Sequence, residues 1–352
     1  MNNKQDKIFE KNPFFLNRED KKDIFYNEIN KLTKHHYLKS NSYKKILKGL
    51  NYKLKNCNLE NLPFLTTNVF KDLKLVSVNE KKIFKTLSSS GTSGSKTSKI
   101  YLDKNNANRQ RIVLTKIFEH HFGNSRLPML IISKNPNIIR DKFDAKIAAI
   151  LGFSIFGKNH TYILEENGDV NFGKLQEFLK KFSKKKFFMF GFTYEVFQTF
   201  FKKIKNNQKI NLKNAILIHG GGWKKLEKNK ISNINFKKKF NNKYNLTKIF
   251  NYYGLIEQIG SIFFECPKCN LFVCSDFSEI FIRDKNFNIL NKGKGLVQLL
   301  SLLPKSYPGH NILTEDIGEI ITNKNSSCNH KGKCFKIYGR VENSIIRGCS
   351  DV

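Results

Sequence analysis

The chain has 352 residues, of which 39% are hydrophobic and 13% aromatic, so it can bury a large core and form two or three subdomains. Its formal net charge of +34 suggests nucleic acid or an anionic membrane as a partner. The lysines, however, are scattered along the chain with acidic residues between them, which is typical of a solvated surface. The composition therefore disfavours a nucleic-acid-binding protein and still favours acidic partners.

The N-terminus and the cysteines indicate a compartment. Met1–Asp6 contains no apolar segment of the secretory type, and no stretch approaches the roughly 20 apolar residues of a membrane span. We therefore expect a cytoplasmic protein without a membrane span. Seven cysteines are an odd number in a large chain, which argues against a disulfide framework and favours reduced thiols that bind metal or do chemistry.

Hydrophobic periodicity predicts secondary structure in chain order. Residues 8–60 have apolar residues at helical spacing, such as Ile24 and Ile29, and a further helix is expected over 105–122. Short β-type runs then alternate with helical ones. The expected strands are 129–132, 162–164, 187–190 and 215–219, and the expected helices are 144–151, 172–182 and 194–204. After about residue 260 strands are expected over 277–282, 295–303, 318–322 and 335–338.

These changes of pattern divide the chain into three parts. A helical lead covers residues 1–60, an α/β core covers 61–260, and a β-rich C-terminal part covers 261–352. Strands that alternate with helices predict a mostly parallel sheet, so the fold class expected is α/β.

A short turn rich in hydroxyls and glycines lies between a strand that begins at Ile83 and a strand over 100–102. Glycines let backbone N–H groups approach phosphate oxygens, hydroxyls donate hydrogen bonds, and Lys96 adds a positive charge. The turn is not a Walker A loop, because Ser95 and not a glycine precedes Lys96. It predicts either a flexible loop or a loop that holds a triphosphate, formed by Ser89, Ser90, Gly91, Thr92, Ser93 and Gly94.

Two further segments follow expected strands, where open α/β sheets usually bind ligands. Gly220, Gly221 and Gly222 follow the strand at 215–218 and allow flat contact by a ring or a phosphate. A plain strand-to-helix turn explains these glycines equally well. The segment from Asn251 to Glu257 follows Lys248–Phe250 and offers an aromatic ring, a glycine and a carboxylate able to hold Mg²⁺.

Taken together, these segments resemble the adenylate-forming superfamily of acyl-CoA synthetases, adenylation domains and luciferases. Ser89–Gly94 resembles its phosphate loop, Gly220–Gly222 its adenine-contacting glycines, and Asn251-x-Tyr253-Gly254-x-x-Glu257 its Asn-x-Tyr-Gly-x-Thr-Glu motif. Ile256 stands in place of the threonine. Thr314-Glu315-Asp316 resembles its Thr-Gly-Asp motif, and the segment from Gly339-Arg340 to Arg347-Gly348 resembles its Gly-Arg…Arg-Gly segment.

The resemblance implies ATP and Mg²⁺ as cofactors and a role for each motif. The segment from Ser89 to Lys96 would hold the β- and γ-phosphates, Gly220–Gly222 and Tyr253 the adenine, Glu257 the Mg²⁺, and Asp316 the ribose. The chain stops soon after Gly339, which implies the large domain of the superfamily without its usual C-terminal lid. Transition-state charge would then be left to Mg²⁺, Lys96 and Arg340.

More narrowly, residues 88–103, 218–226, 253–266 and above all 339–351 resemble LuxE-type acyl-protein synthetases. That family forms an acyl-adenylate from a fatty acid and ATP and moves the acyl group to a cysteine near its own C-terminus, for handover to an acyl reductase. Cys349 occupies that place here. A thiolate is a good nucleophile toward a mixed anhydride, and Arg340 and Arg347 would lower its pKa.

Most of the other cysteines lie in two turn-rich stretches. Cys266-Pro267-Lys268-Cys269 is a Cys-x-x-Cys knuckle, and Cys328-Asn329-His330 follows later in the chain. Cys266, Cys269, Cys328 and His330 together are compatible with a structural Zn²⁺, which some relatives of the phenylacetate-CoA ligase type carry in similar form. Unligated, reduced cysteines are an equal alternative.

Two other functions stay open. The first is an acyl-CoA or acyl-carrier-protein ligase, which would share the adenylation step and differ in the accepting thiol. The second is a basic interaction or nucleic-acid-binding protein that keeps this fold without activity, and the intact motif residues argue against it. The expected partners are a carboxylate substrate such as a fatty acid and an acyl reductase, an acyltransferase or an acyl carrier protein.

Overall fold

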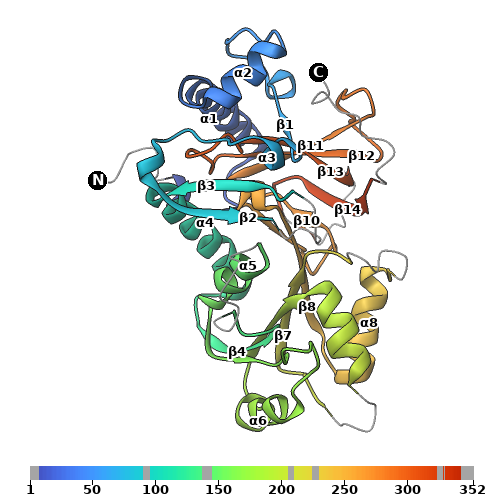
Figure 1. The fold of residues 1–352 in the computed structure, drawn as a ribbon. Coiled ribbons are helices and arrows are strands. Elements are labelled where there is room, and N and C mark those ends of the chain that lie inside the picture. The colour runs from blue at the N-terminus through green and yellow to red at the C-terminus, as the bar shows by residue number, and fades with distance from the viewer. Residues whose placement is uncertain are drawn as a thin grey trace. The chain divides into compact units, whose positions relative to one another are not determined.

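The computed structural model describes residues 8–89, 96–136, 145–204, 210–223, 230–322, 328 and 330–341. The chain forms two compact units (Figure 1). Unit 1 combines residues 1–123 with residues 254–352, and unit 2 is the continuous stretch 124–253. Within the described residues, no helix is both long and apolar enough to cross a membrane.

Unit 2 is built on a parallel sheet with strand order β5-β4-β6-β7-β8. Each neighbouring pair is parallel, and each connection passes through a helical segment, which confirms the expected α/β architecture. The strands are β4 (Leu127–Ile132), β5 (Gly157–Tyr162), β6 (Phe187–Phe192), β7 (Ala215–Gly220) and β8 (Lys248–Gly254).

Helices cover both faces of this sheet. Met189 and Leu217 face one core, which also holds Phe178 of α6 (Phe172–Phe182) and Phe240 of α8 (Asn233–Tyr244). Side chains alternate along a strand, so Phe190 faces the opposite side, where it stacks on Phe153 of α5 (Ala145–Ser154) at 4.6 Å. The remaining helical segments are α7 (Thr193–Glu195) and a π-helix (Val196–Lys202). All six residues of β6 are buried, so its phenylalanines form core.

Unit 1 contains a mainly antiparallel sheet with strand order β10-β14-β13-β12-β11, and β1 pairs in parallel with β13. This confirms the β-rich pattern expected after residue 260. The strands are β1 (Leu65–Thr66), β10 (Phe272–Val273), β11 (Ser278–Arg283), β12 (Gly295–Ser301), β13 (Asn311–Ile320) and β14 (Cys334–Arg340), and β9 (Ile262–Phe264) also belongs to this unit.

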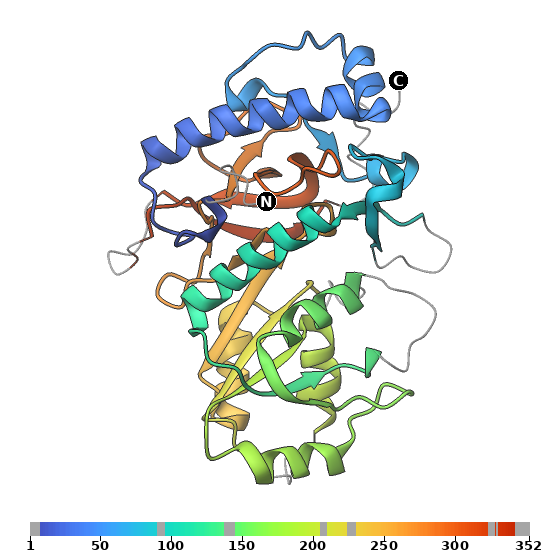
Figure 2. The ribbon, with the colours of Figure 1, turned by 90° about the vertical axis from the view of Figure 1, so that its left-hand side faces the viewer.

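Unit 1 also contains α1 (Arg18–Lys39), α2 (Asn41–Gly49), α3 (Val69–Asp72) and α4 (Lys104–Phe122). The Asn17 side chain caps α1 by accepting a hydrogen bond from the backbone N–H of Asp20. Phe25, Ile29 and Leu32 recur at helical spacing and are buried, so α1 has one face toward the core. Figure 2 shows the long helix α1 lying beside the orange and red strands of the same unit.

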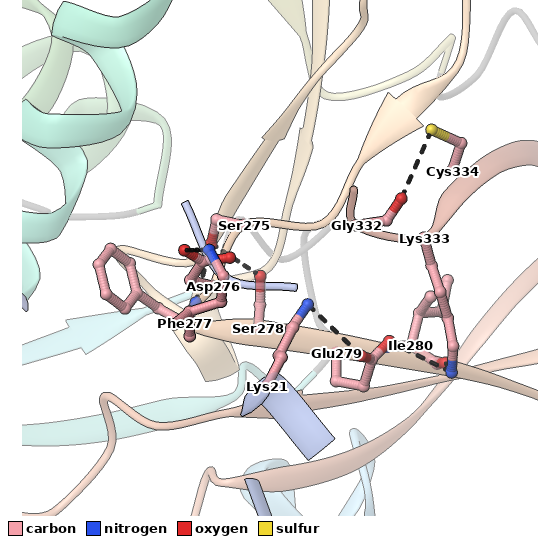
Figure 3. Close-up of polar contacts among 11 residues, drawn as sticks. Lys21, Ser275, Asp276, Phe277, Ser278, Glu279, Ile280, Gly332, Lys333 and Cys334 are labelled. Atoms are coloured by element: carbon pink, nitrogen blue, oxygen red, sulfur yellow. Dashed lines mark hydrogen bonds and ion pairs between the residues drawn. The ribbon is translucent and has the colours of Figure 1, made fainter. Parts of the chain in front are cut away.

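Asp276 fastens the segment before α1 to this sheet. Its carboxylate accepts hydrogen bonds from the backbone N–H groups of Phe15 (2.8 Å) and Leu16 (3.0 Å). Figure 3 shows the neighbouring charges: the Lys21 ammonium lies 3.4 Å from the Glu279 carboxylate, and the Lys333 ammonium lies 3.3 Å from it. Two lysines and one carboxylate therefore join α1, β11 and the residue before β14.

The expected elements differ from the observed ones at four places. The helical lead ends at Gly49, and of residues 50–60 only the start of a short 3₁₀ turn (Leu59–Asn61) is helical. The strand expected at 162–164 lies at Gly157–Tyr162 instead. This segment is an edge strand, so its residues can be polar and do not form the apolar run from which a strand is predicted. Asn251–Gly254, expected as a loop, belongs to β8. The strand expected at 318–322 begins at Asn311. The other expected strands and helices after residue 105 are present, and all of them except the helix over 172–182 have shifted ends.

Candidate functional site

The Ser/Gly-rich turn has a well-defined base. It connects β2 (Ile83–Ser88) with β3 (Lys99–Asp103), which pair antiparallel as expected. Beyond the last rung of this hairpin, the Ser89 N–H donates to the Ser98 carbonyl at 2.9 Å, and the Ser98 N–H donates to the Ser89 hydroxyl at 2.9 Å. These two bonds fix both ends of the turn. Outside the described residues lie the other residues of the motif, Ser90, Gly91, Thr92, Ser93 and Gly94.

Lys96 pairs with an aspartate at the surface. Its ammonium lies 2.9 Å from the Asp72 carboxylate at the end of α3, and both side chains are mostly exposed. The hydrogen bond to Asp72 raises the pKa of Lys96, so the side chain is a cation at neutral pH. An exposed pair of this kind contributes little to stability, so it can break at little cost.

Glu257 is a buried carboxylate in the 3₁₀ turn Ile256–Gln258, directly after β8. Burial raises the pKa of Glu257, and a hydrogen bond from the Ser98 hydroxyl opposes this rise, as do the positive charges of Arg340 and Lys71. A carboxylate with its water removed gains most from a nearby cation. Carboxylate oxygens are also the ligands that Mg²⁺ prefers in proteins.

Asp316 and Arg340 are direct neighbours across β13 and β14. The Arg340 Nε lies 3.8 Å from the Asp316 carboxylate, and the Arg340 side chain is 74% exposed whereas that of Asp316 is 12% exposed. The Asp316 N–H donates to the Thr314 hydroxyl at 3.1 Å, which holds this motif in shape. Arg340 thus lies beside Asp316, and its charge also lowers the pKa of Glu257, so the cation acts on both carboxylates of unit 1.

Unit 2 carries the three glycines of the motif at the end of β7. A Cβ on Gly220 would lie 2.6 Å from both the Tyr252 ring and the Tyr252 carbonyl oxygen. Gly221 has a φ of +80° and lies against Phe192, and Gly222 has a φ of +66°. The close packing of β8 on β7 and the left-handed turn after β7 therefore both require glycine.

Two adjacent tyrosines of β8 point to opposite faces of the sheet of unit 2. Tyr252 packs against Phe153 of α5, with ring centroids 4.9 Å apart. Tyr253 lies on the same side of the strand as Asn251, and both are half-buried. The motif therefore places Asn251 and Tyr253 together, and Tyr252 belongs to the packing.

Of the four residues predicted to bind zinc, the structure brings the three cysteines together. Thiols of Cys266, Cys269 and Cys328 all lie within 4.8 Å of one another. The His330 ring is not a member of this group and lies 5.6 Å from the Phe14 ring and 6.5 Å from the His120 ring, measured between centroids. Cys349 lies outside the described residues, which end at Val341.

Ser98 and Lys71 are two site residues that were not predicted. The Ser98 hydroxyl joins the base of the Ser/Gly-rich turn to Glu257. Its place just after the turn is a signal that could have indicated it. Lys71 comes from α3, about 190 positions before Glu257 in the sequence, and no local pattern distinguishes it from the many other lysines.

Comparison with solved structures shows the fold. 2-Hydroxyisobutyryl-CoA ligase in an open conformation, in complex with 2-HIB-AMP and CoA, matches with a TM-score of 0.72 and 11% identity over 93% of this chain and 76% of that chain. The same ligase in the thioesterification state matches with a TM-score of 0.70 and 12% identity over 94% and 70% of the two chains.

A shorter match is the N-terminal domain of FACL13 from Mycobacterium tuberculosis, with a TM-score of 0.48 and 15% identity over 73% of this chain and 60% of that one. No curated protein sequence matches this chain. The expected adenylate-forming ligase fold is confirmed by the two complexes of the first ligase. The sequence model of the family described as "Acyl-protein synthetase, LuxE" matches residues 1–352, and the chain therefore belongs to this family of ligases.

Proposed function

We propose that this protein activates a fatty acid, or another carboxylic acid, with ATP and then transfers the acyl group to a thiol, its own Cys349. The proposal is supported by family membership and by one observation in particular: the Glu257 carboxylate is buried and hydrogen-bonded to Ser98 at the base of a turn rich in hydroxyls and glycines. A desolvated carboxylate beside phosphate-binding groups is suited to a magnesium nucleotide.

In the first step, a carboxylate oxygen of the substrate forms a bond to the α-phosphorus of ATP. The bond from that phosphorus to the bridging oxygen of pyrophosphate breaks, and the pyrophosphate leaves with the electron pair. The products are an acyl-adenylate and pyrophosphate. Mg²⁺, when bound, supplies positive charge for the phosphate oxygens.

The side chains of unit 1 would divide this work. Glu257 supplies the carboxylate ligand for Mg²⁺, and the Ser98 hydroxyl holds that carboxylate in place. Arg340 is mostly exposed and can turn its guanidinium toward charge that develops on a phosphate. Lys96 would leave its exposed pair with Asp72 to bind the β- and γ-phosphates, and Asp316 would accept hydrogen bonds from the ribose hydroxyls.

Roles are also assigned to unit 2 and to the residues outside the described part. Gly221 and Gly222 are exposed and would offer backbone to an adenine, together with the Tyr253 ring, and Gly220 would support this turn from its buried place against Tyr252. Asn251 shares the side of β8 on which Tyr253 lies. The residues from Ser90 to Gly94 would donate backbone and hydroxyl hydrogen bonds to the phosphates.

In the second step, the thiolate sulfur of Cys349 forms a bond to the acyl carbon. The bond from that carbon to the phosphate oxygen breaks, and AMP leaves with the electron pair. The thiol proton passes to solvent. Cys349 lies only nine residues after Arg340 in the sequence, so the same segment that carries the phosphate-binding arginine carries the acceptor. An acyl reductase that takes the acyl group from this thioester would complete the pathway.

The first test is ATP–pyrophosphate exchange with a panel of carboxylic acids. Glu257→Gln and Lys96→Ala should each lower exchange by about 10²-fold or more, because removal of one electrostatic stabiliser typically costs that much. Glu265→Gln is the matched control, since Glu265 is also buried in unit 1 and is no part of the motifs. Exchange near the wild-type level in both site variants, with the protein folded, would show that the site is misplaced.

The second test separates Cys349 from other acceptors. The protein is incubated with labelled fatty acid and ATP, and the label is mapped by denaturing gel and mass spectrometry. Cys349→Ser should keep pyrophosphate exchange and lose the hydroxylamine-labile label, whereas Cys57→Ser should keep both. If wild-type protein carries no label on any cysteine but acylates coenzyme A or an acyl carrier protein, the function is that of a ligase for those thiols.

A further inference from the structure

Five cysteines of unit 1 lie in the two stretches 266–274 and 328–334, and the adenylation chemistry uses none of them. All five are free thiols, and four of them are buried. Cys266, Cys269 and Cys328 have their sulfur atoms within 4.8 Å of one another. Three sulfurs that meet without a disulfide, two of them from buried cysteines and one from the half-buried Cys269, are a typical arrangement for a metal ion of the zinc type.

The first stretch has a backbone suited to hold a metal. In Cys266-Pro267-Lys268-Cys269-Asn270, the Cys266 carbonyl accepts from the Asn270 N–H at 2.8 Å, and Asn270 has a φ of +55°. The Leu271 N–H then donates to the Cys269 sulfur. This tight turn brings both thiols to one side and supplies an N–H group that stabilises a thiolate, the kind of outer contact that metal sites use.

The second stretch offers a similar arrangement. The His330 N–H donates to the Cys328 sulfur, two residues before it, and the Cys328 thiol also contacts the thiols of Cys266, Cys269 and Cys334. Cys334 is fully buried and lies opposite Val273 in the β10–β14 pair. Cys334 is not among the three sulfurs that lie within 4.8 Å of one another, but it contacts the Cys328 thiol from a position that the sheet fixes, so it can approach as a fourth ligand.

We propose that Cys266, Cys269, Cys328 and Cys334 bind one structural zinc ion as four thiolates. His330 contributes its backbone N–H, while its ring packs against Phe14. In a tetrahedral site with zinc–sulfur bonds of about 2.3 Å, the sulfurs are roughly 3.8 Å apart. The three sulfurs within 4.8 Å of one another then need only a small closure, and Cys334 has to approach them. This ligand set differs from the sequence-based one in its fourth member, Cys334 instead of His330.

The site would hold the edge of the sheet in unit 1. β10 has only two residues, and its pairing with β14 joins the two cysteine-bearing stretches. Such a short edge strand is weakly held by hydrogen bonds alone, whereas a metal cross-links both stretches covalently. β14 begins with Cys334 and ends with Arg340, so the zinc would fix the start of the strand whose end reaches the nucleotide site.

Metal analysis of the full chain, purified without chelator and under reducing conditions, tests the proposal. The wild type should contain about one equivalent of zinc. Cys334→Ser should reduce the content by tenfold or more, and His330→Ala should leave it unchanged. Cys274→Ser is the matched control, because Cys274 is buried like Cys334 but is not one of the thiols that the Cys328 thiol contacts. Less than a tenth of an equivalent in the wild type would overturn the proposal.

A second measurement does not depend on how the variants fold. X-ray absorption of the zinc-loaded wild type should give four sulfurs at about 2.3 Å, whereas a histidine ligand would add a nitrogen at about 2.0 to 2.1 Å. A nitrogen in the first shell would overturn the four-sulfur assignment. Both readouts are independent of the proposed adenylation, so failure of one proposal does not affect the other.

Discussion

The two units differ most in what they bury. Among the described residues, every buried lysine, arginine, aspartate and glutamate lies in unit 1, namely Lys21, Arg109, Glu257, Glu265, Asp276, Arg283 and Asp316. The buried polar side chains described in unit 2 are Ser133, Thr193, Thr199 and His219. Burying a charge costs stability unless it is paired. The core of unit 2 is therefore stabilised by apolar packing. Unit 1 buries charged side chains, which lowers its stability unless they are paired but gives it groups that can take part in chemistry.

The largest expected effect tests the apolar packing of unit 2. Phe240 of α8 is fully buried and lies 4.5 Å from the Phe236 ring and 4.8 Å from the Phe201 ring. Phe240→Ala should lower the free energy of unfolding by about 3 to 5 kcal/mol, because it leaves a cavity. Urea denaturation measures this, with Ile234→Ala on the exposed side of the same helix as control. A loss below about 1 kcal/mol would contradict the comparison.

The second effect tests the paired charges of unit 1. Glu279 lies between Lys21 and Lys333, and although burial raises the pKa of its carboxylate, these lysines lower it more. Glu279→Gln leaves both lysines without their counter-charge and should cost about 3 kcal/mol. Glu319→Gln is the control, since Glu319 is more exposed and accepts from the Tyr338 hydroxyl at 2.7 Å. Equal urea midpoints for both variants would show that the interaction of Glu279 with the two lysines does not stabilise the fold.

A third, smaller effect concerns backbone contact in unit 2. Gly220→Ala would place a methyl group 2.6 Å from the Tyr252 ring and carbonyl oxygen, so β7 and β8 must shift. We expect a loss of about 1 to 3 kcal/mol in the free energy of unfolding. Gly173→Ala in α6 is the control, because the nearest atom is 3.4 Å away and alanine favours a helix. The unfolding temperatures of both variants measure this, and a shift of both in the same direction would contradict the prediction.

The smallest effect concerns pH. Burial keeps the pKa of His310 lowered to about 3, and its Nε2 lies 2.9 Å from the Thr33 hydroxyl. Because the unfolded chain takes up a proton near pH 6.5 and the folded site does not, stability falls as the pH drops from about 6.5 toward 3. The slope is about 1.4 kcal/mol per pH unit for each such histidine.

His310→Gln should therefore reduce the slope of unfolding free energy against pH between pH 6 and 5, while His160→Gln at an exposed position should leave it unchanged. His219 in unit 2 is also buried, and burial lowers its pKa to about 3 as well. His219→Gln should reduce the slope by a similar amount, because a buried histidine lowers the stability of each unit at acidic pH. An unaltered slope in both variants would contradict this account.

The sequence predicts those elements whose burial follows a clear period. The helix expected over 172–182 has the observed bounds, because Leu175, Phe178 and Leu179 recur at helical spacing and face the core. β5 was displaced because Gly157–Tyr162 is an edge strand whose polar residues carry no hydrophobic signal, and the nearby apolar Ile163 and Leu164 attracted the prediction. Asn251–Gly254 has the composition of a loop, yet it belongs to β8, and Asn251 and Tyr252 pair with β7.

For the site, the sequence indicates the residues that lie in recognisable motifs, but it does not indicate the residues that contact them from other segments. Glu257, Asp316 and Arg340 were predicted from their motifs, and the structure places all three in unit 1 with shared interactions. Lys71 acts on Glu257 from a distant segment, which no local pattern contains, whereas Ser98 lies just after the Ser/Gly-rich turn and could have been found there. A distant contact also forms the cysteine cluster, because the pairing of β10 with β14 brings the stretch of Cys328 and Cys334 to the stretch of Cys266.

The split of unit 1 into two stretches sets an order of events during synthesis. The ribosome makes residues 1–123 first, but Asp276, which fastens the segment before α1, is made after the whole of unit 2. At about 5 to 20 residues per second, the first stretch waits several seconds for its partner strands. Unit 2 is continuous and can fold in that interval. Until the last hundred or so residues emerge, the side of α1 that contacts them, through Thr33, His35 and His36, has no partner from that stretch.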